Sequence, residues 1–279
     1  MNRRHSMNAK GILEAYAALA PWLKGDTVDR VIFGDPDKEI RKLLVTWQVS
    51  SAAVEYAAAN GYGAIMTHEP TFWFHRDEWD NVSALPEGSH KKAAALRKAS
   101  LLEGYGITVL RNHDAWDAMP EFGIPWAWAR HLGLSGPTDT RNLAMLHRYD
   151  IEPAALSELA ARIGERTASF ADAPPTFFGR ADSIVRALGI GTGCITTLED
   201  FLDMGCDAVV ACDDGSCYWH DTAWALESGI GVIRVSHFAS EEAGMKSLSE
   251  HAAKLLTGCE VGYLPYDGRA FGAGRAQRL

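Results

Sequence analysis

The chain has 279 residues, of which 47% are hydrophobic and 23% are charged, a composition that excludes a disordered or fibrous protein. Its formal net charge is −9 and no basic stripe offsets it, which argues against binding to the phosphate backbone of nucleic acid. No apolar run approaches the roughly 18 residues of a membrane span, and no signal-type apolar segment follows the charged first ten residues.

Helix-like segments alternate with short apolar runs along the chain, which is the rhythm of a parallel sheet with crossover helices. Apolar residues at helical spacing (Ile12, Tyr16, Leu19 and Leu23) predict a first helix. Strands are then predicted at 30–34, 42–49, 64–67, 107–112, 142–149, 184–190, 207–213, 231–236 and near 260–264. Helices are predicted at 51–60, 90–103, 153–165, 196–204, 222–227 and 240–256.

Turn-forming clusters at 135–139 and 171–175 bracket a small strand and helix. They predict a first α/β lobe at 1–135, a connecting unit at 136–182 and a second α/β lobe at 183–279. The expected fold class is therefore α/β, with two lobes built on mostly parallel sheets. A ligand site is expected between the lobes at the carboxyl ends of the strands, because open α/β sheets bind their ligands there.

Four predicted strands end in histidine or carboxylate side chains. These are His68 and Glu69, then His113, Asp114 and Asp117, then Asp213 and Asp214, and last His237 and Glu241. Imidazole and carboxylate groups ligate Zn, Mn and Fe, and this collection is large enough for two ions. Carboxylates gathered without cations would repel one another, so the shared position at strand ends favours a metal site.

Each of these pairs also has an ordinary explanation. A His-Glu dipeptide after a strand is usually a surface feature, and His237 with Glu241 matches a solvated i,i+4 pair on a helix. Asp213 and Asp214 are followed by glycine, which is typical of a turn. The run G-I-G-T-G at 189–193 favours either a backbone nest for an anion or a tight connection from strand to helix.

Candidate proton-transfer and nucleophilic groups are fewer. His220 precedes a predicted helix, where Asp221 or Thr222 is a plausible N-cap, and its imidazole is a candidate proton shuttle. No G-x-S-x-G motif is present, and only Cys217 lies near a histidine. The five cysteines show no C-x-x-C spacing and are expected to be reduced thiols of a cytoplasmic protein.

Three segments carry a family resemblance. They are I-M-T-H-E-P-T-F-W at 65–73, N-H-D-A-W-D at 112–117 and G-I-G-V-I-R-V-S-H-F-A-S-E at 229–241. They are similar to the "a-H-H-P-l-f", "a-H-t-n-l-D" and "G-H-y-a-S-E" segments of the NIF-three-like family, and order and spacing agree from about Ile12 onward. That family comprises hexameric proteins with a dinuclear metal centre, often labelled homologues of a type 2 GTP cyclohydrolase I.

The resemblance implies that two divalent ions (Zn, Mn or Fe) are held by His68, Glu69, Asp117, His237 and Glu241. His220 or His113 would then move protons or orient a ligand. The chain departs from the family pattern in two ligand-related places. Glu69 stands where the family usually has a second histidine, which makes the site richer in oxygen, and Gln48 stands where an aspartate is expected.

The expected function is that of a dinuclear-metal hydrolase whose metal-bound water attacks a C–N, cyclic amide or phosphoester bond of a small molecule. The alternative is a non-catalytic protein that binds or delivers metal or serves as an interaction scaffold. A coordination position left open to a pocket would distinguish the first from the second. The resemblance also implies a homohexamer. Trp126 and Trp128 are candidate interface residues because tryptophan is enriched at interfaces, and a core role for both is equally natural.

Overall fold

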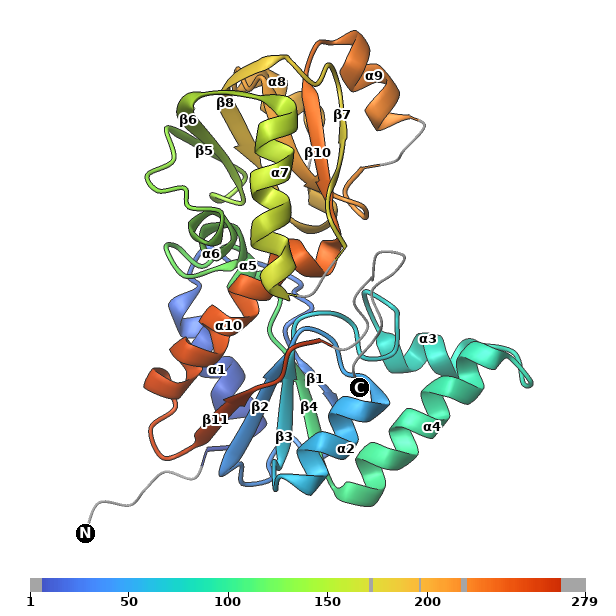
Figure 1. Cartoon of the computed structure of the whole chain (residues 1–279). Coiled ribbons are helices and arrows are strands. Elements are labelled where there is room, and N and C mark those ends of the chain that lie inside the picture. Colours follow the sequence, from blue (N-terminus) through green and yellow to red (C-terminus); the bar gives the residue numbers. More distant parts are fainter. Residues whose placement is uncertain (1–6, 171–172, 196, 217–219, 267–279) are drawn as a thin grey trace. The chain divides into compact units, whose positions relative to one another are not determined.

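The structure is a computed structural model that describes residues 7–170, 173–195, 197–216 and 220–266 (Figure 1). The described chain divides into two compact units. Unit 1 comprises the residues up to Met119 together with those from Met245 onward, and unit 2 comprises Pro120–Gly244. Among the described residues, no helix combines the length and the apolar character that a membrane-spanning segment needs.

Unit 1 is built on a five-stranded sheet with the order β1-β4-β3-β2-β11. Its strands are β1 (Val31–Phe33), β2 (Lys42–Thr46), β3 (Ala64–Thr67), β4 (Thr108–Arg111) and β11 (Glu260–Tyr263). All neighbouring strands are parallel except β1, which runs antiparallel to β4. Its helices are α1 (Ala9–Leu19), α2 (Ser51–Ala59), α3 (Glu78–Ala84), α4 (His90–Tyr105), α5 (Asp114–Asp117) and the C-terminal part of α10 (His237–Leu255).

Local sequence signals explain why these elements form. Ser50 and Ser89 cap α2 and α4, each accepting a hydrogen bond from a backbone N–H of the first helical turn. Gly106, at a φ of +62°, ends α4 in the left-handed conformation that glycine adopts without strain. Apolar residues of α2 and α4 pack with those of β2, β3 and β4 into one core cluster. This core fixes the positions at which β3 and β4 end.

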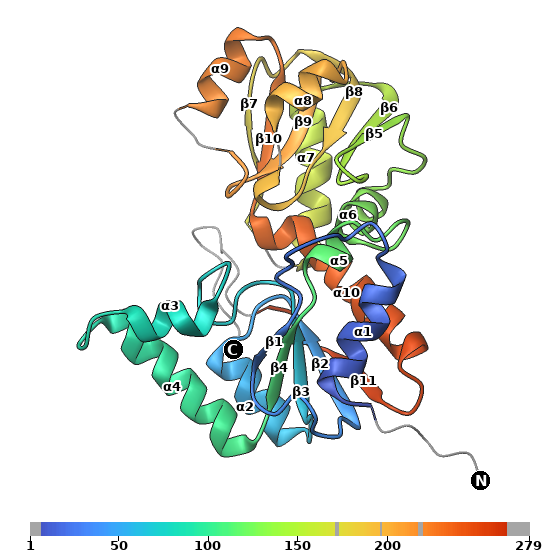
Figure 2. The same cartoon turned by 180° about the vertical axis from the view of Figure 1, so that it is seen from behind.

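Unit 2 is built on a six-stranded sheet with the order β5-β6-β8-β9-β10-β7 (Figures 1 and 2). Its strands are β5 (Asp139–Arg141), β6 (Leu146–Ala155), β7 (Thr176–Phe178), β8 (Ile184–Ile190), β9 (Ala208–Cys212) and β10 (Gly231–Val235). Its helices are α6 (Ile124–His131), α7 (Leu156–Thr167), α8 (Leu198–Asp203), α9 (Asp221–Glu227) and the first turns of α10, with 3₁₀ turns at Ala168–Phe170 and Gly193–Ile195.

The two faces of the sheet in unit 2 are both covered. Ala208, Val210 and Cys212 of β9 pack into the core cluster that contains the apolar face of α7. Val209 and Ala211, the alternate residues of the same strand, pack with residues of α8 and α9. This alternation is why the strand reads as one continuous apolar run in the sequence.

The α/β class with two sheets is confirmed, and the mostly parallel pairing expected for both lobes is found in unit 1. In unit 2 that expectation is wrong, because only β8, β9 and β10 pair in parallel, whereas β5, β6 and β7 join the sheet by antiparallel pairs. β5 and β6 are joined by a short connection, which permits only antiparallel pairing. The predicted helix at 153–165 starts later, at Leu156, because the preceding residues continue β6.

The observed division also differs from the expected boundaries 1–135, 136–182 and 183–279. β11 pairs in parallel with β2, so the C-terminal segment belongs to the first sheet. β6 pairs with β8, so the expected connecting unit is part of the second sheet. Elements of eight residues or fewer were not all predicted. The unpredicted ones are β5, β7, α3, α5 and α6.

Candidate metal centre

In unit 1, β3 delivers His68 and Glu69 at its carboxyl end. All four residues of β3 are buried, and His68 is fully buried as well. The backbone N–H groups of His68 and Glu69 both donate to the carbonyl of Trp47, at 3.1 and 2.8 Å. Two successive N–H groups therefore turn toward one acceptor, which a regular strand does not allow. Pro70, which has no backbone N–H to continue strand pairing, follows directly.

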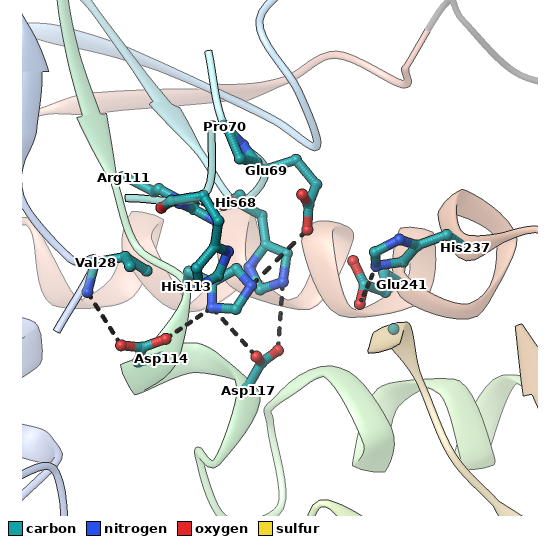
Figure 3. Close-up of polar contacts among 12 residues, drawn as sticks. Val28, His68, Glu69, Pro70, Arg111, His113, Asp114, Asp117, His237 and Glu241 are labelled. Atoms are coloured by element: carbon teal, nitrogen blue, oxygen red, sulfur yellow. Dashed lines mark hydrogen bonds and ion pairs between the residues drawn. The ribbon is translucent and has the colours of Figure 1, made fainter. Parts of the chain in front are cut away.

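The next strand, β4, delivers His113 and Asp117 through the short helix α5. Asp117 Oδ1 lies 3.3 Å from Nε2 of His68, and Asp117 Oδ2 lies 3.4 Å from Nδ1 of His113 (Figure 3). The two imidazole rings stack with their centroids 4.3 Å apart. Donor atoms of His68, His113 and Asp117 all lie within 4.8 Å of one another. Glu69 Oε1 is 3.8 Å from Nε2 of His113.

Hydrogen bonds orient both rings for ligation. Nδ1 of His68 lies 3.3 Å from the carbonyl of Asn112, and Nδ1 of His113 lies 2.9 Å from Oδ1 of Asp114. With a proton on each Nδ1, both Nε2 atoms carry a lone pair toward the carboxylates of the cluster. Two nitrogen donors with adjacent carboxylate oxygens are a donor set that fits a transition-metal ion.

Asp29, which no sequence pattern pointed to, and Asp114, which was a candidate ligand, hold α5 in place. Asp29 accepts hydrogen bonds from the backbone N–H groups of His113, Asp114 and Ala115, at 2.6, 2.9 and 2.8 Å. Asp114 accepts from Thr27 Oγ1 at 2.8 Å and from the backbone N–H of Val28 at 3.1 Å. Asp29 directly precedes the predicted strand at 30–34, and no local pattern in the sequence predicts that it caps so distant a helix.

Burial and hydrogen bonding shift the pKa values of these two carboxyls in opposite directions. Burial raises the pKa of Asp29, although hydrogen bonds from the backbone of His113 and Ala115 act against it. Burial also acts to raise the pKa of Asp114, but hydrogen bonds from His113, Thr27 and Val28 outweigh it and hold that pKa well below its usual range. Asp114 is therefore the carboxylate that orients His113.

Gln48, at the position where the resemblance expects an aspartate, contacts the segment that carries His68 and Glu69. Its Nε2 donates to the carbonyl of Pro70 at 3.2 Å, and its Oε1 accepts from the hydroxyl of Tyr266 at 2.9 Å. In this chain the residue thus holds the backbone of that segment by a neutral hydrogen bond.

In unit 2, His237 and Glu241 lie one turn apart on α10, with His237 Nε2 3.0 Å from Glu241 Oε1 (Figure 3). The spacing thus brings the two side chains together, as predicted. Asp213 accepts from the backbone N–H of His237 at 2.8 Å, and Asp214 Oδ2 lies 3.3 Å from Nδ1 of the same ring. The two aspartates therefore orient His237, in addition to forming the turn that the sequence indicated.

Close packing in unit 2 explains the glycines at both ends of the run 189–193. A Cβ on Gly193, whose φ is +54°, would lie 3.0 Å from Glu241 Oε1 and 3.1 Å from His237 Nε2. A Cβ on Gly189 would lie 2.5 Å from the ring of Phe201. A side chain at position 193 would therefore displace His237 or Glu241, and one at position 189 would clash with α8. This close packing agrees with the expected tight connection.

The remaining candidates are less enclosed or less reactive. His220 precedes α9 with 62% of its side chain exposed, and its Nδ1 lies 2.8 Å from Oδ1 of Asp221. Cys217 lies outside the described residues. Burial raises the pKa of Cys206 to about 12 and also raises that of Cys212, so neither thiol is activated.

Comparison with curated proteins finds relatives that match most of the chain. A curated relative from Allochromatium vinosum, named GTP cyclohydrolase 1 type 2 homolog, is 25% identical over 78% of this chain and 80% of its own length. A relative of the same name from Haemophilus influenzae is 26% identical over 77% of this chain and 81% of its own length.

Solved structures with low sequence identity share the fold. A hypothetical protein of Staphylococcus aureus has a TM-score of 0.77 and 16% identity, with 95% of this chain and 99% of that chain covered. The Bacillus cereus protein related to NIF3 has a TM-score of 0.71 and 13% identity, with 96% and 99% covered. The family profile Duf34/NIF3 (NGG1p interacting factor 3) matches residues 7–265. Since that match spans nearly the whole chain, the protein belongs to the Duf34/NIF3 family.

Proposed function

We propose that this protein is a dinuclear-metal-dependent hydrolase of a small molecule. The observation that carries the proposal is the cluster of His68, His113 and Asp117, whose donor atoms lie within 4.8 Å of one another at the ends of β3 and in α5. We propose that two divalent ions (Zn, Mn or Fe) are held by His68, Glu69, Asp117, His237 and Glu241. Because this donor set is rich in oxygen, it also suits metal ions that are harder than Zn.

Metal ions bound by these residues would lower the pKa of a coordinated water and polarise a C–N, cyclic amide or phosphoester bond. The chain's own contribution to proton transfer is assigned to His113. The proposed ligand set does not include His113, so its Nε2 can accept or return a proton while the carboxylate of Asp114 holds its Nδ1–H at 2.9 Å. The name of the curated relatives is a reason to test C–N bonds of purine-type rings first.

His220 is proposed as a second proton-transfer group. Its imidazole is largely exposed and hydrogen-bonded to Asp221, so it can exchange protons with solvent. We expect His220→Asn to lower turnover by roughly 10²–10⁴ and to leave the metal content unchanged. A fall in metal content would instead show that His220 supports the metal site.

Metal analysis tests the ligand set directly. We expect close to two ions per chain in the purified protein, and loss of metal without unfolding in His237→Ala and Glu241→Ala. His90→Ala, which removes an exposed histidine of unit 1, is the matched control and should keep its metal. Unchanged stoichiometry in both variants of α10 would exclude His237 and Glu241 as ligands.

Activity is tested on a panel of cyclic amides, nucleotides and phosphoesters, with metal-loaded and metal-stripped protein compared side by side. kcat/KM should fall toward acid pH with an apparent pKa near ~7 for a zinc-type site. If neither the metal-loaded nor the metal-stripped protein turns over any substrate, the result favours the alternative, a non-catalytic protein that binds or delivers metal. We further propose a cytoplasmic homo-oligomer, a hexamer by family resemblance.

A further inference from the structure

The segment that carries His68 and Glu69 runs from residue 68 to residue 75 and contains neither helix nor strand; we refer to it as the ligand segment. A single side chain holds both of its ends. Arg111, on β4, donates from Nε to the carbonyl of His68 at 2.7 Å and from Nη1 to the carbonyl of His75 at 2.8 Å. The side chain of Arg111 is fully buried, and Figure 3 shows it beside the backbone of His68.

The middle of the ligand segment is held by two other buried ionisable residues. Lys98 donates to the carbonyls of Thr71 and Val49, at 2.7 and 2.6 Å. Glu78 accepts from the backbone N–H of Phe72 at 2.5 Å. Side chains from β4, α4 and α3 therefore impose the course of this segment, which its local sequence does not determine.

Burying a charged guanidinium costs desolvation free energy that an apolar side chain in the same core position would not cost. Burial lowers the pKa of Arg111, and the carboxylates of Glu69, Glu78, Asp114 and Asp29 act against that shift. The other three residues of β4 are buried too, so an apolar side chain would suit position 111 as packing. What an apolar side chain lacks is the planar fork, which reaches two carbonyls at once.

We propose that Arg111 is a positioning residue for the metal centre. By fixing the carbonyls of His68 and His75, it holds His68 and Glu69 in the geometry that ligation requires. This inference rests on the metal centre proposed above, and it concerns the binding of metal rather than the reaction.

The sign of the effect on metal affinity separates positioning from plain electrostatics. A positive charge near bound cations repels them, so removing Arg111 for its charge alone would tighten metal binding. Removing a group that orients ligands weakens metal binding, typically by about 10–100-fold. Arg111→Met removes the charge and the fork together, and we expect the weakening to prevail.

Co²⁺ is the probe, because its absorption bands report the ligand geometry and its affinity is measured by competition with a chelator. We expect Arg111→Met and Arg111→Lys each to weaken Co²⁺ binding by about tenfold or more and to alter the bands. Lysine keeps the charge but cannot span both carbonyls. Should Arg111→Met fail to fold by circular dichroism, Arg111→Lys alone decides the comparison.

Lys98→Met is the matched control, since it also removes a buried cation that holds two carbonyls but touches neither His68 nor Glu69 through those bonds. It should lower the melting temperature of the apoprotein and change Co²⁺ affinity less than threefold. Equal weakening by Lys98→Met would reduce the role of Arg111 to general stability. Unchanged or tighter Co²⁺ binding by the Arg111 variants would overturn the proposal.

The same titration separates this inference from the proposed function. Wild-type protein that binds Co²⁺ but turns over no substrate refutes the hydrolase and leaves the test of Arg111 intact. Wild-type protein that binds no Co²⁺ overturns the metal centre and, with it, the role of Arg111.

Discussion

Glu69 shows how one side chain changes the chemistry of the candidate centre. Its carboxylate is largely enclosed, with 15% of the side chain exposed, and it lies 3.8 Å from Nε2 of His113. His113 thus supplies an imidazole next to the position where the family usually has one. The cluster in unit 1 therefore keeps two imidazoles, while its additional negative charge favours harder ions.

The selectivity of the site for its metal should follow the residue at position 69. We expect Glu69→His to increase the retention of Zn over Mn, because it exchanges a hard oxygen donor for an imidazole. Glu69→Gln, which removes the charge without adding a nitrogen ligand, is the control. The measurement is the Zn to Mn ratio retained from an equimolar mixture. A ratio that stays constant in Glu69→His would place Glu69 outside the ligand set.

At the scale of elements, α5 has only four residues and cannot be stable by itself. It exists because the carboxylate of Asp29 accepts hydrogen bonds from three consecutive backbone N–H groups at its start. His113 and Asp117 lie at the two ends of this turn, so the order of α5 sets the distance between them.

Removing the carboxylate of Asp29 should therefore weaken both the fold and the site. Asp29→Ala leaves three partly buried N–H groups without this acceptor. We expect a loss of about 1–3 kcal/mol in the free energy of unfolding, measured by urea denaturation of the apoprotein. Asp26→Ala is the control, because its side chain is 75% exposed and its ion pairs with Arg30 and Arg76 lie at the surface. Equal losses in the two variants would contradict the capping role.

Glu78, the first residue of α3, carries a buried carboxyl. Burial raises the pKa of Glu78 from 4.5 to about 7, although the N–H of Phe72 and the charges of Arg111 and Lys98 lower it. Between these two pH values the folded state keeps a proton that the unfolded state has lost. The contribution of Glu78 to stability is therefore present at low pH and is lost as the pH rises through about 7.

Glu78→Gln tests this sign, because glutamine still accepts from Phe72 but does not ionise. The free energy of unfolding of the variant, relative to wild type, should rise between pH 5 and pH 8 by up to about 3 kcal/mol. Urea denaturation of both proteins at the two pH values gives the difference. A difference that is the same at pH 5 and pH 8 would show that Glu78 is ionised throughout.

For the whole molecule, the family resemblance implies a homohexamer, and the two candidate interface tryptophans bear on that prediction. Trp128 is fully buried in the core of unit 2, and Trp126 is half-buried with its ring 4.5 Å from that of His147. Of the two roles that the sequence left open for these tryptophans, Trp128 has the core role, because its side chain is fully buried within unit 2. The family resemblance is the remaining support for an oligomer.

Light scattering at micromolar concentration should give a mass well above the 30.4 kDa of one chain, and a hexamer by family resemblance. The same sample under denaturing conditions should give the mass of the single chain. A stable monomer under native conditions would refute the assembly and would leave the metal centre to be tested on single chains.

Elements whose signals are local could be predicted from the sequence. The apolar runs of β3 and β8 were predicted with their observed bounds, and the serines that cap α2 and α4 mark where those helices begin. The positions of His68 and His113 followed from the apolar runs of β3 and β4, which end just before them. The pairing of His237 with Glu241 followed from their spacing, because a helix brings residues four apart together.

Interactions between residues far apart in the sequence depend on the folded chain and could not be predicted. β11 pairs with β2 across more than two hundred residues, and Asp29 caps a helix that begins about 85 positions later. Arg111 binds a segment that starts 43 positions earlier. Local periodicity and capping signals report on neighbours within a few residues. Which carboxylate or guanidinium reaches a given backbone group depends instead on how the sheet orders its strands, and that order is set by the packing of the whole core.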